Sequence, residues 1–341
     1  MMLFFLNDYG NGAHPKIMEA LCRTNLELTP GYGTDAYCEK AINCIRQLCK
    51  SPEADVHFIV GGTQVNKTAI GAFLRPWEAV ITADTGHIQV HEAGAIENNG
   101  HRLCLLPTPD GKLRPEQIDN LCGLYKNDET ATDPKIVYIS NTTELGTVYT
   151  TDELKAIRRV CDKWDLYLYC DGARIASAMA VTGADLADYA EICHAFTIGG
   201  TKNGLLFGEA LVITEPALTT SFRRCMKQQG AMLAKGRLLG IQFLTALEDG
   251  LYMTLGATAL ETARMLSDGI KALGIPMKID SPSNQIFPIL SNEKIEALSR
   301  EVAFEHWCKI DDSHSCIRFV CAWHTTKEDV SALLEILKKL A

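Results

Sequence analysis

The chain has 341 residues, of which 47% are hydrophobic and 22% charged, as in a folded protein with a large buried core. Its 33 lysines and arginines against 42 aspartates and glutamates give a net charge of −9. These values exclude a disordered chain, a collagen-like repeat and a coiled coil, and no basic run is long enough to bind nucleic acid or an anionic membrane surface.

The cysteines and the start of the chain predict a cytoplasmic protein. The thirteen cysteines include no C-x-x-C pair, are odd in number and mostly stand among apolar residues. This spacing favours reduced, buried thiols over a zinc site or a disulfide framework. The apolar run at residues 1–6 is too short for a signal peptide or a membrane span.

From about residue 13 to 214, short β-rich runs alternate with amphipathic stretches. The predicted strands are Val56–Val60, Ala79–Thr82, Arg102–Leu106, Ile136–Ser140, Leu166–Cys170, Ala195–Ile198 and Ala210–Ile213. The predicted helices are Asp35–Cys49, Thr63–Leu74, Arg114–Tyr125, Thr151–Trp164 and Ala173–Val181. Strands that are apolar along their length and separated by helices indicate an α/β protein whose mainly parallel sheet is covered on both faces.

After residue 215 the pattern changes. Two long helices are predicted, at Met232–Asp249 and Thr254–Leu273, before a second unit begins. Its predicted elements are strand Ile286–Leu290, helix Asn292–Phe304, strands Trp307–Ile310 and Cys316–Cys321, and helix Thr326–Lys339. We therefore expect a large α/β domain with an N-terminal arm over residues 1–250 and a small α+β domain over residues 251–341.

Three polar motifs directly follow predicted strands, where open α/β sheets bind ligands. They are Gly61-Gly62-Thr63, Asp171-Gly172-Ala173-Arg174 and Gly199-Gly200-Thr201-Lys202. Singly, each has an ordinary explanation: a tight turn, a helix cap with a solvated arginine, or a loop lysine. Together they supply a phosphate turn, a carboxylate for a ring nitrogen and an amine for an aldehyde, which is what pyridoxal 5′-phosphate requires.

With these motifs the chain resembles the threonine aldolase and β-eliminating lyase family of fold-type I pyridoxal-phosphate enzymes. The resemblance passes in order through Asn7–Tyr9, Tyr32–Gly33, Gly62–Thr63, His87 with Glu92–Gly94, Asp171–Arg174, Thr197–Lys202 and Ile317–Arg318. It implies a large domain with a mainly parallel seven-stranded sheet and a smaller C-terminal α+β domain. It also implies cleavage of a β-hydroxy-α-amino acid, such as L-threonine or L-allo-threonine, to glycine and an aldehyde.

The resemblance gives the cofactor its ligands. Lys202 would hold pyridoxal 5′-phosphate covalently, and Asp171 would pair with its pyridine nitrogen. His87 would lie flat on the ring, although an unspecialised loop histidine is the alternative. Gly62 and Thr63 would hold the phosphate.

The substrate would be held by its α-carboxylate. Arg318 stands mid-strand between apolar neighbours, where a charge needs a partner, and its guanidinium fork suits a carboxylate. By resemblance Arg174 would share this ligand, with a contribution from Asn7, which replaces the family's usual serine. A histidine that many members carry to meet the β-hydroxyl has no counterpart in 127–134. We therefore expect weak discrimination at Cβ, and the base for the hydroxyl proton stays unidentified.

Enzymes of this group generally build each site from two subunits. The segment Lys227–Lys235 resembles the stretch that reaches a neighbour's phosphate, so Lys235 would make that contact in a homodimer or homotetramer. A plain surface lysine is the alternative. His87 and His91 have the spacing of two metal ligands on a helix, but no third ligand is apparent, and we expect no metal.

Three other functions stay open. Another fold-type I activity, such as β-elimination, transamination or racemisation, would use the same residues. A dinucleotide-binding protein would explain Gly31–Ala36, which mimics G-x-G-x-x-A, although Asn25–Pro30 makes a poor preceding strand. A catalytically dead scaffold is the third, and the presence of Lys202, Asp171 and Arg318 argues against it.

Overall fold

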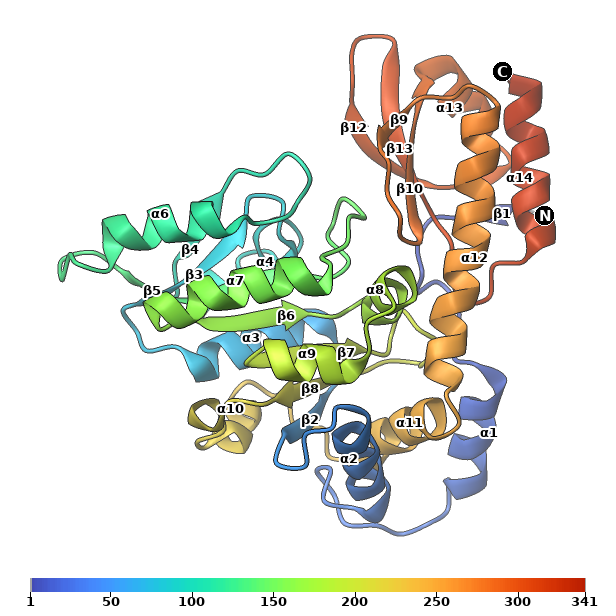
Figure 1. The fold of residues 1–341 in the computed structure, drawn as a ribbon. Coiled ribbons are helices and arrows are strands. Elements are labelled where there is room, and N and C mark those ends of the chain that lie inside the picture. The colour runs from blue at the N-terminus through green and yellow to red at the C-terminus, as the bar shows by residue number, and fades with distance from the viewer. Residues whose placement is uncertain (1, 341) are drawn as a thin grey trace.

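The computed structural model describes residues 2–340, so only the outermost residues of the two predicted domains, 1 and 341, lie outside it. A seven-stranded sheet forms its centre (Figure 1). The strands are β2 (Asp55–Ile59), β3 (Glu78–Ala83), β4 (Leu103–Leu106), β5 (Asp133–Ser140), β6 (Tyr167–Asp171), β7 (Ala195–Gly199) and β8 (Glu209–Ile213). Their order is β2-β8-β7-β6-β5-β3-β4, and only β8 runs antiparallel to its neighbours. The predicted mainly parallel seven-stranded sheet is confirmed.

Helices cover both faces of this sheet because successive strand residues point to opposite sides. In β5, Val137 and Ile139 enter one core, while Ile136 and Tyr138 enter the other. The first core receives apolar side chains from α1 (Pro15–Thr24), α2 (Ala36–Leu48), α6 (Pro115–Tyr125), α7 (Thr151–Trp164), α8 (Ile175–Thr182), α9 (Leu186–Ile192) and α11 (Arg237–Glu248). The second receives them from α3 (Gly62–Phe73), α4 (His87–Val90), α5 (Ala95–Asn98) and α10 (Phe222–Gln228), the last preceded by a short 3₁₀ turn at Pro216–Leu218.

The C-terminal unit is built on a four-stranded antiparallel sheet with the order β12-β13-β10-β9. Its elements are β9 (Met277–Ile279), β10 (Gln285–Ser291), α13 (Asn292–Leu298), β11 (Val302–Ala303), β12 (Glu305–Lys309), β13 (His314–Val320) and α14 (Lys327–Leu340). The long helix α12 (Leu251–Ala272) connects the two units (Figure 1). Its first half contacts α8, and its second half packs on α14 and β10.

The start of the chain packs on this C-terminal unit. Strand β1 (Leu3–Phe4) pairs in parallel with β11. Phe5 is fully buried against Phe319, and its carbonyl accepts a hydrogen bond from Val320 N–H. The chain then crosses to the large sheet, so its first residues connect the two units.

Two predicted helices were too long. The helix expected at Asn292–Phe304 ends at Leu298, because the following residues pair with β1. The helix expected at Met232–Asp249 begins only at Arg237.

The dinucleotide motif has a different role. Residues 25–30, directly before Gly31, form no strand, and Asp35 caps α2 through the N–H groups of Tyr37 and Cys38. Within residues 2–340, all thirteen cysteines are free thiols, and no helix has the length and apolar composition needed to cross a membrane.

Candidate active site

A cavity of about 480 Å³, within the range of small-molecule sites, lies where the carboxyl ends of β2, β5, β6 and β7 meet the start of β8. Two residues of the small domain, Glu305 and Arg318, complete its wall. Seven of the predicted residues line it: Gly62, Thr63, His87, Asp171, Arg174, Lys202 and Arg318. Two others, Asn7 and Lys235, do not line it.

The Gly61-Gly62-Thr63 turn forms an open cradle at the start of α3. Gly61 is the N-cap and offers no side chain, and the first helical hydrogen bond is donated by Val65 N–H to its carbonyl. The N–H groups of the first turn are therefore unpaired within the helix. A Cβ added to Gly61 or Gly62 would meet no atom within 4 Å. Free donors around open space at a helix N-terminus suit an anion such as phosphate.

Asp171 ends β6 as a buried, fully hydrogen-bonded carboxylate. Its Oδ2 accepts from Tyr138 Oη at 2.6 Å and from Asn66 Nδ2 at 2.8 Å, and its Oδ1 accepts from Ala173 N–H at 3.0 Å. Burial alone would raise the pKa of Asp171, but the nearby His87 and these hydrogen bonds hold the pKa below its usual value. The site thus keeps a negative charge in a buried position.

Asn66 extends this network to His87. Its amide nitrogen also donates to Glu92 Oε1 at 2.8 Å, and its oxygen accepts from Tyr169 Oη at 2.9 Å. Glu92 Oε1 lies 2.8 Å from His87 Nδ1. Burial would lower the pKa of His87, but the hydrogen bond to Glu92 and nearby carboxylates raise it. The imidazole is therefore fixed in orientation by a carboxylate behind it.

Across residues 2–340, His91 belongs to no group of three or more possible metal ligands. Donor atoms of His87, Glu92 and Asp171 lie within 4.8 Å of one another instead. The oxygens of Glu92 and Asp171 that accept from Asn66 are already engaged, and His87 Nδ1 is bonded to Glu92. These three side chains form a hydrogen-bonded network.

Lys202 stands in the turn that follows β7. Its pKa is lowered by burial and by the charge of Arg174. The preceding Thr201 donates its hydroxyl to Glu209 Oε1 at 3.0 Å and accepts from Gly208 N–H at 3.1 Å, which fixes the turn. Lys202 is half-buried, and a lysine amine that loses its proton more readily is a better nucleophile.

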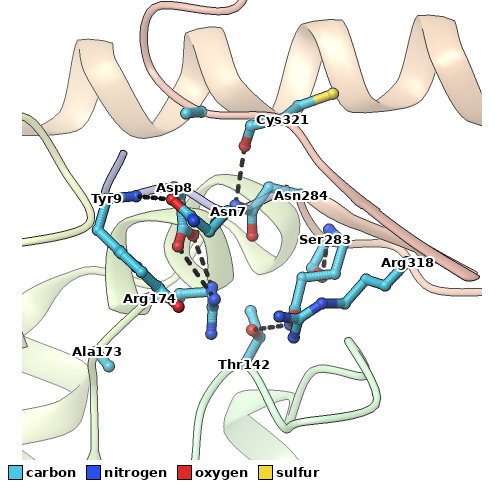
Figure 2. A network of polar contacts seen from close by, with 12 residues as sticks. Asn7, Asp8, Tyr9, Thr142, Ala173, Arg174, Ser283, Asn284, Arg318 and Cys321 are labelled. Carbon is cyan, nitrogen blue, oxygen red and sulfur yellow. Dashed lines mark hydrogen bonds and ion pairs between the residues drawn. The ribbon is translucent and has the colours of Figure 1, made fainter. Parts of the chain in front are cut away.

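Arg174 is paired with a carboxylate from the N-terminal arm (Figure 2). Its Nε and Nη2 donate to the two oxygens of Asp8 at 2.7 and 3.1 Å, and Asn284 Nδ2 donates to the same carboxylate at 3.0 Å. Burial would raise the pKa of Asp8, but Arg174 and Lys202 hold it below its usual value. Asn7 lies beside this pair and accepts from the N–H of Tyr9 at 3.1 Å.

Arg318 has the anionic partner that its mid-strand position predicts. It forms an ion pair with Glu305 from the neighbouring strand β12 and donates to Gln285 Oε1 at 2.8 Å. Its guanidinium lies 5.0 Å from the centre of the Trp307 ring. The Nε atom is buried without a partner, so one donor of the fork is unused.

Several residues of the site were missed from sequence. They are Asp8, Asn66, Glu92, Tyr138, Glu144 and Glu209. One available signal was a polar residue on the buried face of a helix. Asn66 is buried in α3 together with the apolar Val65 and Ala69.

The segment 127–134, which lacks the family's histidine for the β-hydroxyl, does not line the cavity. Residues 127–134 reach only the first residues of β5, at the amino end. The carboxyl end of β5, Ser140, leads to Glu144, and both line the cavity.

Comparison with known proteins identifies the family and the fold. The model of the β-eliminating lyase family matches residues 6–292. The low-specificity L-threonine aldolase of Pseudomonas aeruginosa is 32% identical over 334 residues, which cover 96% of this chain and 95% of the relative. The structure of Leishmania major threonine aldolase matches with a TM-score of 0.97 and 44% identity over 99% of both chains. An aspartate aminotransferase of Thermus thermophilus, with a TM-score of 0.71 at 15% identity over 100% of this chain and 92% of its own, shares the fold.

Proposed function

Because the chain belongs to the threonine aldolase and β-eliminating lyase family, we propose that it cleaves L-threonine or L-allo-threonine to glycine and acetaldehyde with bound pyridoxal 5′-phosphate. The fold is that of fold-type I enzymes. The observation that carries the proposal is the convergence of Lys202, Asp171 and the open Gly61–Gly62 turn on one cavity.

The residues present fit this cofactor. The turn at Gly61–Gly62 leaves open space beneath free backbone donors, which suits a phosphate group. Asp171 supplies a buried carboxylate with a lowered pKa, and Lys202 supplies a half-buried amine with a lowered pKa. A phosphate, a ring nitrogen and an aldehyde therefore each find a matching group.

Each of these residues would have one task. When bound, pyridoxal phosphate supplies an electron sink that stabilises negative charge at the substrate Cα. Lys202 holds the cofactor covalently, and Asp171 keeps a proton on the pyridine nitrogen. His87, fixed in orientation by Glu92, would contact the cofactor ring. Gly62 and Thr63 bind the phosphate through their N–H groups and the hydroxyl.

Substrate orientation would depend on the two arginines. Arg174 and Arg318 would bind the α-carboxylate, and Asn7, which does not line the cavity and accepts from Tyr9 N–H, would contribute only if it moved in from the arm. Holding the carboxylate would fix the orientation of the substrate and so select the Cα bond on which the cofactor's electron sink acts. Arg318 keeps Nε free, while Glu305 occupies another part of its fork. We expect Glu305 to turn toward solvent when substrate binds, since its side chain is 36% exposed.

Borohydride trapping tests the cofactor assignment. The purified protein should be yellow, lose its colour with borohydride, and carry the label on Lys202 in a peptide map. A label on another lysine would contradict the role of Lys202, and colourless protein that takes up no cofactor would contradict the whole proposal.

Product analysis tests the reaction. Incubation with L-threonine should give glycine and acetaldehyde in equal amounts. The appearance of 2-oxobutanoate instead would identify β-elimination, and exchange of the α-proton alone would identify racemisation.

We further propose that the protein is a homodimer or homotetramer in which Lys235 reaches the neighbour's phosphate. Lys235 is exposed, and Ala234 beside it accepts a hydrogen bond from Tyr32 N–H at 2.9 Å. The loop that leads to Tyr32 carries Leu26 and Leu28, which are 91% and 100% exposed. Apolar side chains this exposed support an interface at this surface. Light scattering should give at least the mass of a dimer. Lys235→Ala should weaken the affinity for the cofactor without dissociating the oligomer.

Two broader proposals have structural support. The thirteen free thiols support a cytoplasmic location. Division into residues 1–250 and 251–341 is supported by α12, which starts at Leu251 and leads into the small domain, while residues 3–5 pack on that second unit.

A further inference from the structure

Glu144 is a cavity carboxylate that the proposed function leaves without a task. It lines the cavity and is only 8% exposed. Among residues 2–340, no side chain or backbone group forms a hydrogen bond or a close ion pair with its carboxylate. A buried carboxylate without a partner is unfavourable unless a ligand supplies one.

The loop that carries Glu144 is held in place on both sides. Gly146 N–H donates to Thr143 C=O at 2.9 Å and closes a tight turn around Glu144. The small domain forms two hydrogen bonds with the same turn. Ser281 Oγ donates to Gly146 C=O at 2.9 Å, and Gln285 Nε2 donates to Thr143 C=O at 3.2 Å. Gly146 has a φ of +75°, which suits glycine. Glu144 is therefore presented to the cavity from a rigid turn.

The charge of Glu144 acts on the groups that would surround the substrate. It favours the protonated forms of His87, Arg174, Lys202 and Arg318. Two of these would hold the cofactor, and two would hold the α-carboxylate. Glu144 thus lines the same cavity as both sets of groups and lies within electrostatic range of them.

The other cavity carboxylates are engaged. Both oxygens of Asp171 accept hydrogen bonds, and Glu305 is paired with Arg318. Glu209 accepts from Thr201 through Oε1 only, and its buried Oε2 has no partner, but burial raises its pKa to about 8, so it holds a proton at neutral pH and is not a free base.

The histidines differ in position. His87 Nδ1 is bonded to Glu92, and the ring would lie against the cofactor. His91 is exposed and lies beside His87, with 5.4 Å between the ring centres. It is the rival of Glu144 as a proton acceptor.

We propose that Glu144 is the base that takes the β-hydroxyl proton of the substrate, an inference that rests on the proposed function. As the proton passes to a Glu144 oxygen, the electron pair of the O–H bond becomes the second C–O bond of the aldehyde. The Cα–Cβ bond breaks, and its electron pair stays at Cα, which then takes up a proton to give glycine. Glu144 returns its proton to water, so the cleavage needs no other reactant.

Glycine provides the decisive comparison because it has an α-proton and a carboxylate but no β-hydroxyl. In Glu144→Gln, kcat for threonine cleavage should fall by about 10²–10⁴-fold, the usual contribution of a general base. The dissociation constant of glycine and the rate of its α-proton exchange in D₂O should change by less than about threefold, under 1 kcal/mol. His91→Asn, the matched variant, should keep cleavage within about threefold of wild type.

A second measurement keeps the test valid if Glu144→Gln folds poorly. Glu144→Ala, assayed by cleavage per cofactor-loaded subunit, should be inactive and should regain activity with added formate. Four results would overturn the inference: wild-type cleavage in Glu144→Gln, an equal loss of glycine binding and exchange, loss of cleavage in His91→Asn, or no formate rescue. The equal loss would make Glu144 a counter-ion of the arginines. If the wild-type protein produced no aldehyde from either threonine epimer, the proposed function itself would fail.

Discussion

Replacing Asp171 with asparagine would remove a buried charge and disturb the hydrogen bonds around it. One carboxylate oxygen accepts from Tyr138 and Asn66, and the other accepts from Ala173 N–H. The single oxygen of an asparagine can serve only one of these sides, so its amide group faces a donor on the other. An unmatched buried donor destabilises the fold by about 1–3 kcal/mol. Losing the charge opposite the ring nitrogen should lower kcat by a further hundredfold or more, about 3 kcal/mol.

Tyr138→Phe separates these two effects. It removes one donor to Asp171 but leaves the charge and the hydrogen bond from Asn66. Acetaldehyde release, followed with alcohol dehydrogenase and NADH, should fall by no more than about tenfold in this variant, the scale of one hydrogen bond. Urea unfolding of the loaded proteins measures the stability difference.

Two results would refute this reasoning. Near-normal turnover in Asp171→Asn would mean that the carboxylate acts only as a cap for the turn at Ala173. Equal losses of activity in Asp171→Asn and Tyr138→Phe would mean that the hydrogen bonds, and not the charge, support catalysis.

Four further predictions follow from the same structure. Arg318→Lys keeps the charge but loses the two-pronged fork, so KM for threonine should rise at least about tenfold, and an unchanged KM would contradict this. The kcat/KM values for threonine and allo-threonine should differ by no more than about a hundredfold, because a carboxylate base can accept the hydroxyl proton through either oxygen. A preference of many thousandfold for one epimer would contradict weak discrimination at Cβ. His194 is buried and neutral, with its pKa lowered from 6.5 to about 4, so the unfolded chain takes up its proton first as the pH falls. The free energy of unfolding, measured by urea titration, should therefore be unaffected by this group above pH 6.5 and should fall by up to about 3 kcal/mol as the pH drops from 6.5 to about 4. The fall should be smaller in His194→Gln. Gly172→Ala would place a Cβ 2.0 Å from Thr197 O and should lower the free energy of unfolding by about 1–3 kcal/mol or more, whereas Gly123→Ala, in open space on a helix, should raise it by about 0.5–1 kcal/mol.

Elements with local signals were predicted well from the sequence. The seven strands of the large sheet are nearly continuous apolar runs because helices bury both faces, and all seven were located. The helix Thr151–Trp164 was predicted with its observed bounds, since the carboxylates of its first turn mark its start and Glu153 forms a capping box with Thr150. Elements that depend on distant partners were missed. Strand β11 exists only because β1 lies beside it, and this pairing ends the helix that its own residues would continue.

The site divides in the same way. Asp171 is the last residue of β6 and Lys202 stands in the turn after β7, so a rule about strand ends finds them. Tyr138 has the pattern of a core residue, and its contact with Asp171 arises only when two strands pair. Asp8 stands next to a predicted residue, but its partner Arg174 is far along the chain. Periodicity in one strand or helix carries no information about such contacts.

The pairing of β1 with β11 also constrains when the cavity can be completed during synthesis. The ribosome releases Leu3 long before Val302, so the first strand waits without its partner while the large sheet is made. Phe5 can become buried only after β13 has been synthesised, because it packs on Phe319 and bonds to Val320 of that strand. The same N-terminal arm holds Asp8 beside Arg174. A nascent chain can therefore build the scaffold early, but the substrate side of the cavity forms among the last parts of the protein.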